Sequence, residues 1–261
     1  MNRVTRALVA TATPALFVVS LAAQATPPDK TSPAGSGGLN RTPAVAKQPA
    51  PRLPDGHIDL SGVWQGGGPV GDIAQGLPKG EEVPMNDWAK KEMASRQAKD
   101  DPEANCLPTG VPRIAPYPWR IVQTPTHIFF LFEGNIHSYR QIFMDGRKHP
   151  DPDELDPTWY GHSIGRWDGD TLVVDSVGFN DRFWFDFKGH PHTEKLHTIE
   201  RYTRKDMGTL ENKTTIDDPG AYTRPFTITF TARLRPKEEL MEYICNEDNL
   251  DVHHITGKAG L

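Results

Sequence analysis

The sequence predicts an all-β protein: an antiparallel barrel of about nine or ten strands with one peripheral helix. Short runs of β-branched and aromatic residues recur from Trp119 onward, separated by Gly, Pro and Asp turn signals. Two of these signals, Glu133-Gly134-Asn135 and Asp168-Gly169-Asp170, are typical of tight hairpins. Closing a sheet removes its exposed edges, so this many short strands favour a barrel, with a two-sheet sandwich as the alternative.

The expected strands are short and follow one another closely. Trp64 alternates with Leu60 and Gly62 in the first of them and is expected in the core. One amphipathic helix is expected over residues 84–99, with Asn86 as its N-cap and its apolar face packed on the outside of the sheet. The strands are expected at residues 57–65, 120–123, 128–132, 136–144, 164–167, 171–176, 196–204, 209–217, 227–234 and 240–245.

The first residues are typical of a secretory signal peptide. Arg3 and Arg6 form a positive start, residues 7–21 are almost all apolar or small, and Ala23-Gln24-Ala25 matches a signal-peptidase site. We therefore expect residues 1–25 to be removed and the protein to be periplasmic or secreted. The alternative is a retained membrane anchor, but the apolar run is shorter than the roughly 20 residues that span a bilayer.

Residues 26–54 are rich in Pro, Ala, Gly and Ser, so we expect a disordered linker before a barrel domain at residues 55–261. The net charge is −5, and the absence of a basic stripe with interleaved aromatics argues against nucleic acid as a partner. The sequence contains no basic amphipathic helix, so no membrane binding is expected after signal cleavage. The expected partner is a small-molecule or carbohydrate ligand.

Cys106 and Cys245 are the two cysteines of the chain. An even count in an exported protein favours a disulfide between them. Two buried free thiols are the alternative, and a metal site made of cysteines alone is excluded by their number.

Three motifs of the chain are similar to motifs of one group of proteins. They are DGHIDLSGVW at residues 55–64, WYGHSIGRWDGDTL at 159–172 and GHPHTE at 189–194. They resemble a large group of secreted bacterial proteins of unknown function, which implies export and carries over no activity. The triplet Gly62-Val63-Trp64 is also similar to the Gly-x-Trp that opens the first strand of lipocalins. That resemblance implies a lipocalin-like barrel, although lipocalins carry their helix after the last strand.

The GHPHTE motif contains candidate metal ligands. If this segment is extended, His190, His192 and Glu194 lie on one face. Two imidazoles and one carboxylate form a set that divalent transition metals bind. Pro191 cannot join a central strand, which leaves a loop or an edge strand as alternatives. These histidines could instead act in acid/base chemistry, bind substrate or have a structural role, and no other cofactor is expected.

Tyr160 and His162 are candidate catalytic residues in the middle motif. Gly161 and Gly165 allow the backbone to approach another strand or a ligand closely. We interpret His162 as a candidate base and Tyr160 as a candidate proton donor in a polar barrel lining. A core histidine held by a backbone carbonyl is the alternative.

Arg140 shares a strand face with Ile142 and Met144. An arginine on such an apolar face is costly unless it is paired or faces an anion. It is therefore a candidate for binding a substrate carboxylate or a developing oxyanion. A structural pair with an aspartate is the alternative.

Residues 179–187 are rich in Phe and Trp and form either a core strand, a flap, or an aromatic platform for a sugar ring. Asp186, within this run, is expected to orient His192 as a base.

The chain lacks a Gly-x-Ser-x-Gly elbow, a phosphate-binding Gly-rich loop, a dinucleotide fingerprint and a His-Glu-x-x-His motif. The leading hypothesis is an acid/base enzyme (lyase, hydratase or hydrolase) that acts on a small polar or sugar-like substrate, with His162 or His192 as base. The alternative is a non-catalytic carrier or sensor that binds a ligand in the barrel. A metal-dependent enzyme is a third hypothesis.

Overall fold

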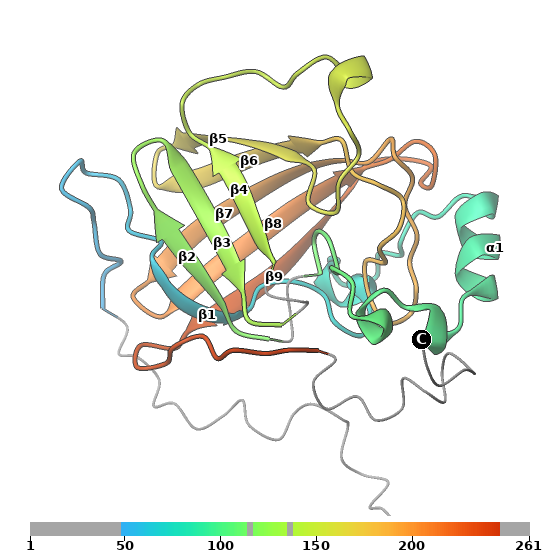
Figure 1. Ribbon diagram of the computed structural model, residues 1–261, viewed down its shortest axis with the longest axis horizontal. Helices are drawn as coiled ribbons and strands as arrows, with labels where there is room; N and C mark the ends of the chain where they lie inside the picture. Colours follow the sequence, from blue (N-terminus) through green and yellow to red (C-terminus); the bar gives the residue numbers. More distant parts are fainter. Residues whose placement is uncertain (1–47, 114–116, 135–137, 246–261) are drawn as a thin grey trace, which may run out of the picture. The chain divides into compact units, whose positions relative to one another are not determined.

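Within the described part of the chain, nine strands close into a barrel in the order of the sequence (Figure 1). The computed structural model describes residues 48–113, 117–134 and 138–245. The strands are β1 (Gly62–Gly66), β2 (Trp119–Gln123), β3 (His127–Phe132), β4 (Tyr139–Phe143), β5 (His162–Asp168), β6 (Thr171–Val177), β7 (His197–Asp206), β8 (Thr209–Asp217) and β9 (Phe226–Leu234). The helices are α1 (Asp87–Ser95) and the short 3-10 helices η1 (Ile73–Gly76), η2 (Ala98–Asp100), η3 (Glu103–Asn105) and η4 (Pro152–Glu154).

The predicted barrel is confirmed, with one departure from antiparallel pairing. β4 and β5 pair in parallel, whereas the other neighbouring strands are antiparallel. Asp145-Gly146 does not make a tight hairpin; the chain instead runs through η4 before β5 begins. Parallel neighbours require a long connection that returns the chain to the same end of the sheet, and residues 144–161 supply it.

The tenth strand that we expected at residues 240–245 does not form. β1 already pairs with β9, so closure leaves no free sheet edge for a further strand. The segment is held by other contacts: the Met241 backbone N–H donates to Glu133 Oε2 at 2.8 Å.

Large side chains fill the barrel interior. Trp64, Trp119, Phe130 and Tyr202 are fully buried in one cluster. The Trp119 and Phe130 rings lie 4.9 Å apart, and Phe130 meets Tyr202 edge to face at 5.3 Å. The described barrel therefore has a packed core where a lipocalin would hold its ligand.

Connections at one end of the barrel build a second core. Phe179, Phe183 and Phe185 are fully buried there, together with Tyr222 and Phe226. The aromatic run at residues 179–187 is thus mostly core, and Phe187 is the exposed exception. Because these rings are buried, they do not form an open aromatic platform for a sugar ring.

The helix α1 begins at the expected cap. Asn86 Oδ1 accepts the Ala89 backbone N–H at 2.9 Å, and the Asn86 backbone N–H donates to Ala221. Ala89 is the buried residue of the helix, whereas Trp88 is exposed. The helix lies outside the barrel wall, beside the loops of the second core (Figure 1).

The predicted disulfide is confirmed. Cys106 and Cys245 are bonded, with their Cα atoms 5.7 Å apart. The bond ties the end of η3 to the segment after β9, and it is consistent with an extracytoplasmic location.

The expected signal peptide and most of the expected linker lie outside the described residues. Residues 48–54, assigned to the linker, contact the barrel: Arg52 pairs with Asp170 at 2.7 Å, and Gln48 accepts the Met207 backbone N–H. In the described residues, no helix combines the length and apolarity needed to cross a bilayer.

Candidate functional site

A groove of about 480 Å³ opens between β4 and the segment that leads into β5. The two strands pair only through residues 142–143 and 163–164, so the first part of β4 is not paired with β5. Three of the expected catalytic residues line this groove together: Arg140, Tyr160 and His162.

Three histidines and one aspartate form a hydrogen-bonded chain beside the groove. His162 Nδ1 lies 2.8 Å from His149 Nδ1, and His149 Nε2 lies 3.2 Å from Asp175 Oδ1. The same oxygen lies 2.8 Å from His197 Nε2. Ser163, Ser176 and Thr198 are buried, so their neighbours along β5, β6 and β7 project from the outer face of the barrel.

These hydrogen bonds determine which ring nitrogens carry protons. The Asp175 carboxylate only accepts, so it takes the Nε2–H of both His149 and His197. A neutral His149 then has its lone pair on Nδ1, which accepts the Nδ1–H of His162. His162 is left with a lone pair on Nε2, which is the form that a general base requires.

The surroundings of His162 keep this ring neutral. Partial burial lowers its pKa from 6.5, and the positive charge of Arg147, together with that of His149 whenever the His149 ring is protonated, lowers it further. The ring also stacks on Phe143, with centroids 5.2 Å apart. His162 is therefore unprotonated at neutral pH and held in a defined orientation.

Tyr160 lies on the barrel side of the groove. Its hydroxyl is 2.5 Å from Ser138 Oγ, and its ring stacks on Phe132 at 5.3 Å. Burial raises its pKa to about 12. The phenol keeps its proton at neutral pH, so it suits a hydrogen-bond donor better than a group that releases a proton.

Arg140 extends from β4 into the barrel and is paired with Glu200 of β7. Its Nη2 donates to Glu200 Oε2 at 2.5 Å and to Ser176 Oγ at 2.8 Å, and its Nε donates to Ser163 Oγ at 3.1 Å. Glu200 also accepts the Tyr202 hydroxyl at 2.6 Å. Arg140 therefore forms the structural ion pair that the sequence offered as the alternative, with a glutamate in place of the expected aspartate. Nη1 nevertheless has no hydrogen-bond partner among the described residues.

His192 is buried among aromatic rings, away from the groove. Its ring lies 3.8 Å from that of Phe183 and 5.1 Å from that of Phe185. Its Nε2 has no partner among the described residues. Burial lowers its pKa to about 3, which makes it a weak base at neutral pH.

Asp186 orients a different histidine from the one we expected. Asp186 Oδ2 lies 2.6 Å from His190 Nδ1 and accepts the Ile73 backbone N–H at 2.5 Å, whereas His192 Nδ1 lies 3.2 Å from the Thr193 carbonyl. Asp186 thus joins the β6–β7 connection to the start of η1. The expected pairing with His192 is corrected accordingly.

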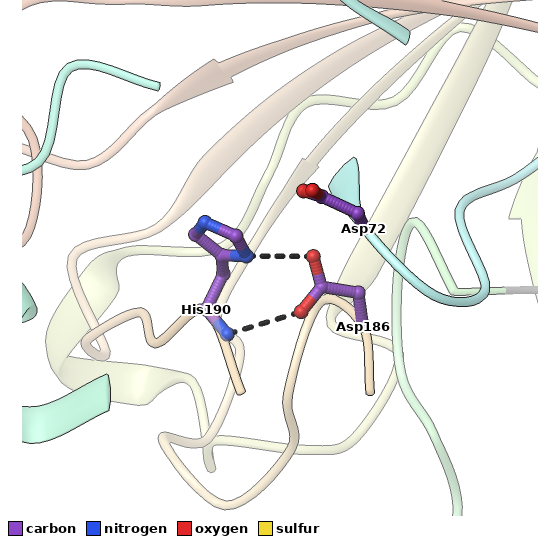
Figure 2. Close-up of side chains that lie close together, drawn as sticks. All are labelled: Asp72, Asp186 and His190. Carbon is purple, nitrogen blue, oxygen red and sulfur yellow. Dashed lines mark hydrogen bonds and ion pairs between the residues drawn. The ribbon is translucent and has the colours of Figure 1, made fainter. Parts of the chain in front are cut away.

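His190 lies in a cluster with two carboxylates, Asp72 and Asp186 (Figure 2). The oxygens of the cluster have protein partners: Lys188 Nζ lies 2.6 Å from Asp72 Oδ2, and Asp186 accepts from backbone and imidazole N–H groups. Both carboxylates therefore have hydrogen-bond or ion-pair partners within the described residues.

The expected metal set of His190, His192 and Glu194 is not brought together in the described structure. The segment is a loop rather than a strand, and Glu194 is an exposed turn residue, whereas both histidines are buried. The alternation of faces that grouped the three residues requires an extended strand, which Pro191 disfavours.

The sequence reasoning missed the partners that orient His162. Asp175 could have been found, because the turn at residues 168–170 sets the register in which Asp175 lies opposite Ile164, on the same face as His162. His149 gave no such signal, since it lies in the irregular β4–β5 connection.

A second cavity, of about 460 Å³, lies at the end of the barrel near the β5–β6 turn. Ile128, Met144 and Trp167 form its apolar wall, and His57 stacks on Trp167 at 4.8 Å. The Gln123 amide at its edge is bonded to the Leu60 N–H and the Ile58 carbonyl.

No protein-family model, curated protein or solved structure matches this chain.

Proposed function

We propose that this protein is an exported acid/base enzyme, a lyase, hydratase or hydrolase, that acts on a small polar substrate in the groove between β4 and β5. His162 is the general base. His149 and Asp175 position it, and Tyr160 donates a hydrogen bond to the substrate. The predicted signal peptide and the disulfide support a periplasmic or secreted location.

The observation that carries the proposal is the contact between His162 Nδ1 and His149 Nδ1 at 2.8 Å, continued to Asp175. A carboxylate that orients an imidazole also stabilises the imidazolium formed when the base takes a proton. Here the effect of Asp175 is relayed through a second imidazole. The proton removed from the substrate, or from a water that attacks it, goes to His162 Nε2.

Arg140 has a supporting place in this proposal. Its side chain is buried inside the barrel, where it donates to Glu200, Ser176 and Ser163, so we assign it to holding the wall of the groove from within rather than to binding an oxyanion. The ion pair with Glu200 holds the guanidinium in place.

The second candidate function is non-catalytic binding of a small ligand. The apolar cavity near Trp167 favours it. In that case the ligand sits at the end of the barrel, because the described interior is filled.

A proton-abstraction probe tests the proposal without knowledge of the natural substrate. Removal of the C3 proton of 5-nitrobenzisoxazole breaks the N–O bond and gives a coloured cyanophenolate. The wild-type protein is expected to accelerate this reaction over buffer, and the rate should rise with pH through a pKa below 6.5. His162→Gln should reduce the rate to the buffer level, and Asp175→Asn should lower it by about 10²-fold.

The matched control is His57→Gln, which alters a partly buried histidine that stacks on Trp167 and lies outside both the groove and the chain of histidines. Its rate should equal that of the wild type. Equal rates for wild type and His162→Gln, or no acceleration by the wild type, would count against His162 as an accessible base.

A further inference from the structure

The walls of the groove carry aromatic and polar side chains that the proposed proton transfer does not use. Tyr139 lies at the start of β4 and is 60% exposed. Trp159 lies across the groove in the segment before β5. Trp159 is partly buried against the second core, whereas Tyr139 is exposed, and an exposed aromatic ring in a concave site presents an apolar face to a ligand.

The polar wall residues are also uncommitted. Among the described residues, no hydrogen bond or ion pair engages the side chains of Gln141, Asp156 and Thr158. An amide, a carboxylate and a hydroxyl together offer both donors and acceptors. They suit a ligand with several neighbouring hydroxyl groups, each of which donates and accepts.

The combination identifies a ligand class. A pyranose ring has an apolar face of C–H groups and an edge of hydroxyls, and the groove offers aromatic faces and mixed polar groups. We propose that the groove binds pyranose sugars, with Tyr139 stacking on the ring and Gln141 and Asp156 bonding its hydroxyls. This inference names the substrate class of the proposed enzyme. It rests on the proposed function in one respect, which is that the sugar and the proton transfer are placed in the same groove.

Other ligand classes fit the same walls less well. A purely apolar ligand would leave Gln141, Asp156 and Thr158 without partners on binding, which is costly. A strongly anionic ligand would meet the Asp156 carboxylate in the groove, while the guanidinium of Arg140 is paired with Glu200.

Isothermal titration calorimetry on the mature wild-type protein tests the proposal. The probes are cellotetraose, mannotetraose and trigalacturonate, which differ in hydroxyl orientation and charge, with 4-nitrophenol as an aromatic ring without sugar hydroxyls. At least one of the two neutral oligosaccharides is expected to bind more tightly than 4-nitrophenol, and trigalacturonate, which carries three carboxylates, is expected to bind more weakly than that oligosaccharide. Tyr139→Ala and Gln141→Ala should each weaken that binding about tenfold, whereas Tyr139→Phe should retain it.

The controls are Trp88→Ala on α1, an exposed aromatic outside the groove, and Gln75→Ala on η1; both should bind as the wild type does. Failure of both neutral oligosaccharides to bind, or equal binding of 4-nitrophenol with no effect of Gln141→Ala, would overturn the inference. Sugar binding without proton abstraction from 5-nitrobenzisoxazole would support this inference and overturn the proposed enzyme, so the two failures are distinguishable.

Discussion

Burial of the His192 imidazole couples folding to pH. Its pKa is lowered to about 3 in the folded state by burial, against an ordinary value of about 6.5 in the unfolded chain. As pH falls below 6.5 the unfolded chain takes up the proton first, so this contribution to stability is complete above pH 6.5 and is lost as pH falls towards 3. The loss is about 1.4 kcal/mol per pH unit within that window.

His192→Leu removes this titration, so its free energy of unfolding is expected to fall less steeply between pH 6.5 and 4.5 than that of the wild type. The difference between the two proteins should change by about 2 kcal/mol over that interval. Urea unfolding at several pH values measures it. Parallel pH dependences for the two proteins would contradict the burial assigned to His192.

At the residue level, the sequence predicted the right kinds of side chain more reliably than their partners. Arg140, Tyr160 and His162 were candidates by chemistry, and they line one groove. Asp186 was assigned to the wrong histidine. His190 and His192 are separated by one residue, and only the conformation of the loop determines that His190 contacts Asp186 while His192 contacts Phe183.

At the level of elements, the turn into β5 requires a glycine at Gly161. Its φ is +63°, and an added Cβ would lie 2.6 Å from the Val177 carbonyl oxygen. Gly169 has a similar φ of +58° with no atom within 4 Å of the added Cβ, which makes it a matched control for the steric contact.

Gly169→Ala is expected to lower the free energy of unfolding by about 1 kcal/mol, the cost of the left-handed backbone alone. Gly161→Ala should cost at least about 2 kcal/mol, because the backbone must also shift away from Val177. Chemical denaturation of both variants provides the comparison. Equal losses in the free energy of unfolding would show that contact with the Val177 carbonyl of β6 does not limit which side chain residue 161 can carry.

The β5–β6 hairpin was predictable from its local turn chemistry, and the turn expected at residues 133–135 lies partly outside the described residues. Two other features were not predictable. The parallel pairing of β4 with β5 depends on the path of residues 144–161, which contains no regular pattern. The failure of residues 240–245 to form a strand depends on β1 pairing with β9, a contact between the two ends of the barrel that a local pattern cannot reveal.

At the scale of the whole molecule, the disulfide closes a loop across a sequence separation of 139 residues. In the chain-entropy model such a bond stabilises the fold by up to about 5 kcal/mol. The double variant Cys106→Ser/Cys245→Ser is therefore expected to unfold at lower urea concentration than the oxidised wild type. Dithiothreitol should lower the stability of the wild type to that of the variant and leave the variant unchanged; an effect on both would point to another cause.

The barrel as a whole followed from the number of short strands, but the groove did not. The groove exists because β4 and β5 share only two paired residues each, and its chain of histidines draws on three strands and one connection. Sequence reasoning could therefore supply the fold class and individual candidates, but not the side of the barrel on which they meet.

The most direct test of the central claim is nitrogen NMR of the histidine rings of the wild-type protein across pH. We expect His162 to be the Nδ1–H tautomer with an unprotonated Nε2, to titrate with a pKa below 6.5, and to change in both respects in Asp175→Asn. An Nε2–H tautomer of His162 at neutral pH, or a titration unaffected by Asp175→Asn, would contradict the proposal that the chain from Asp175 through His149 prepares His162 as a base.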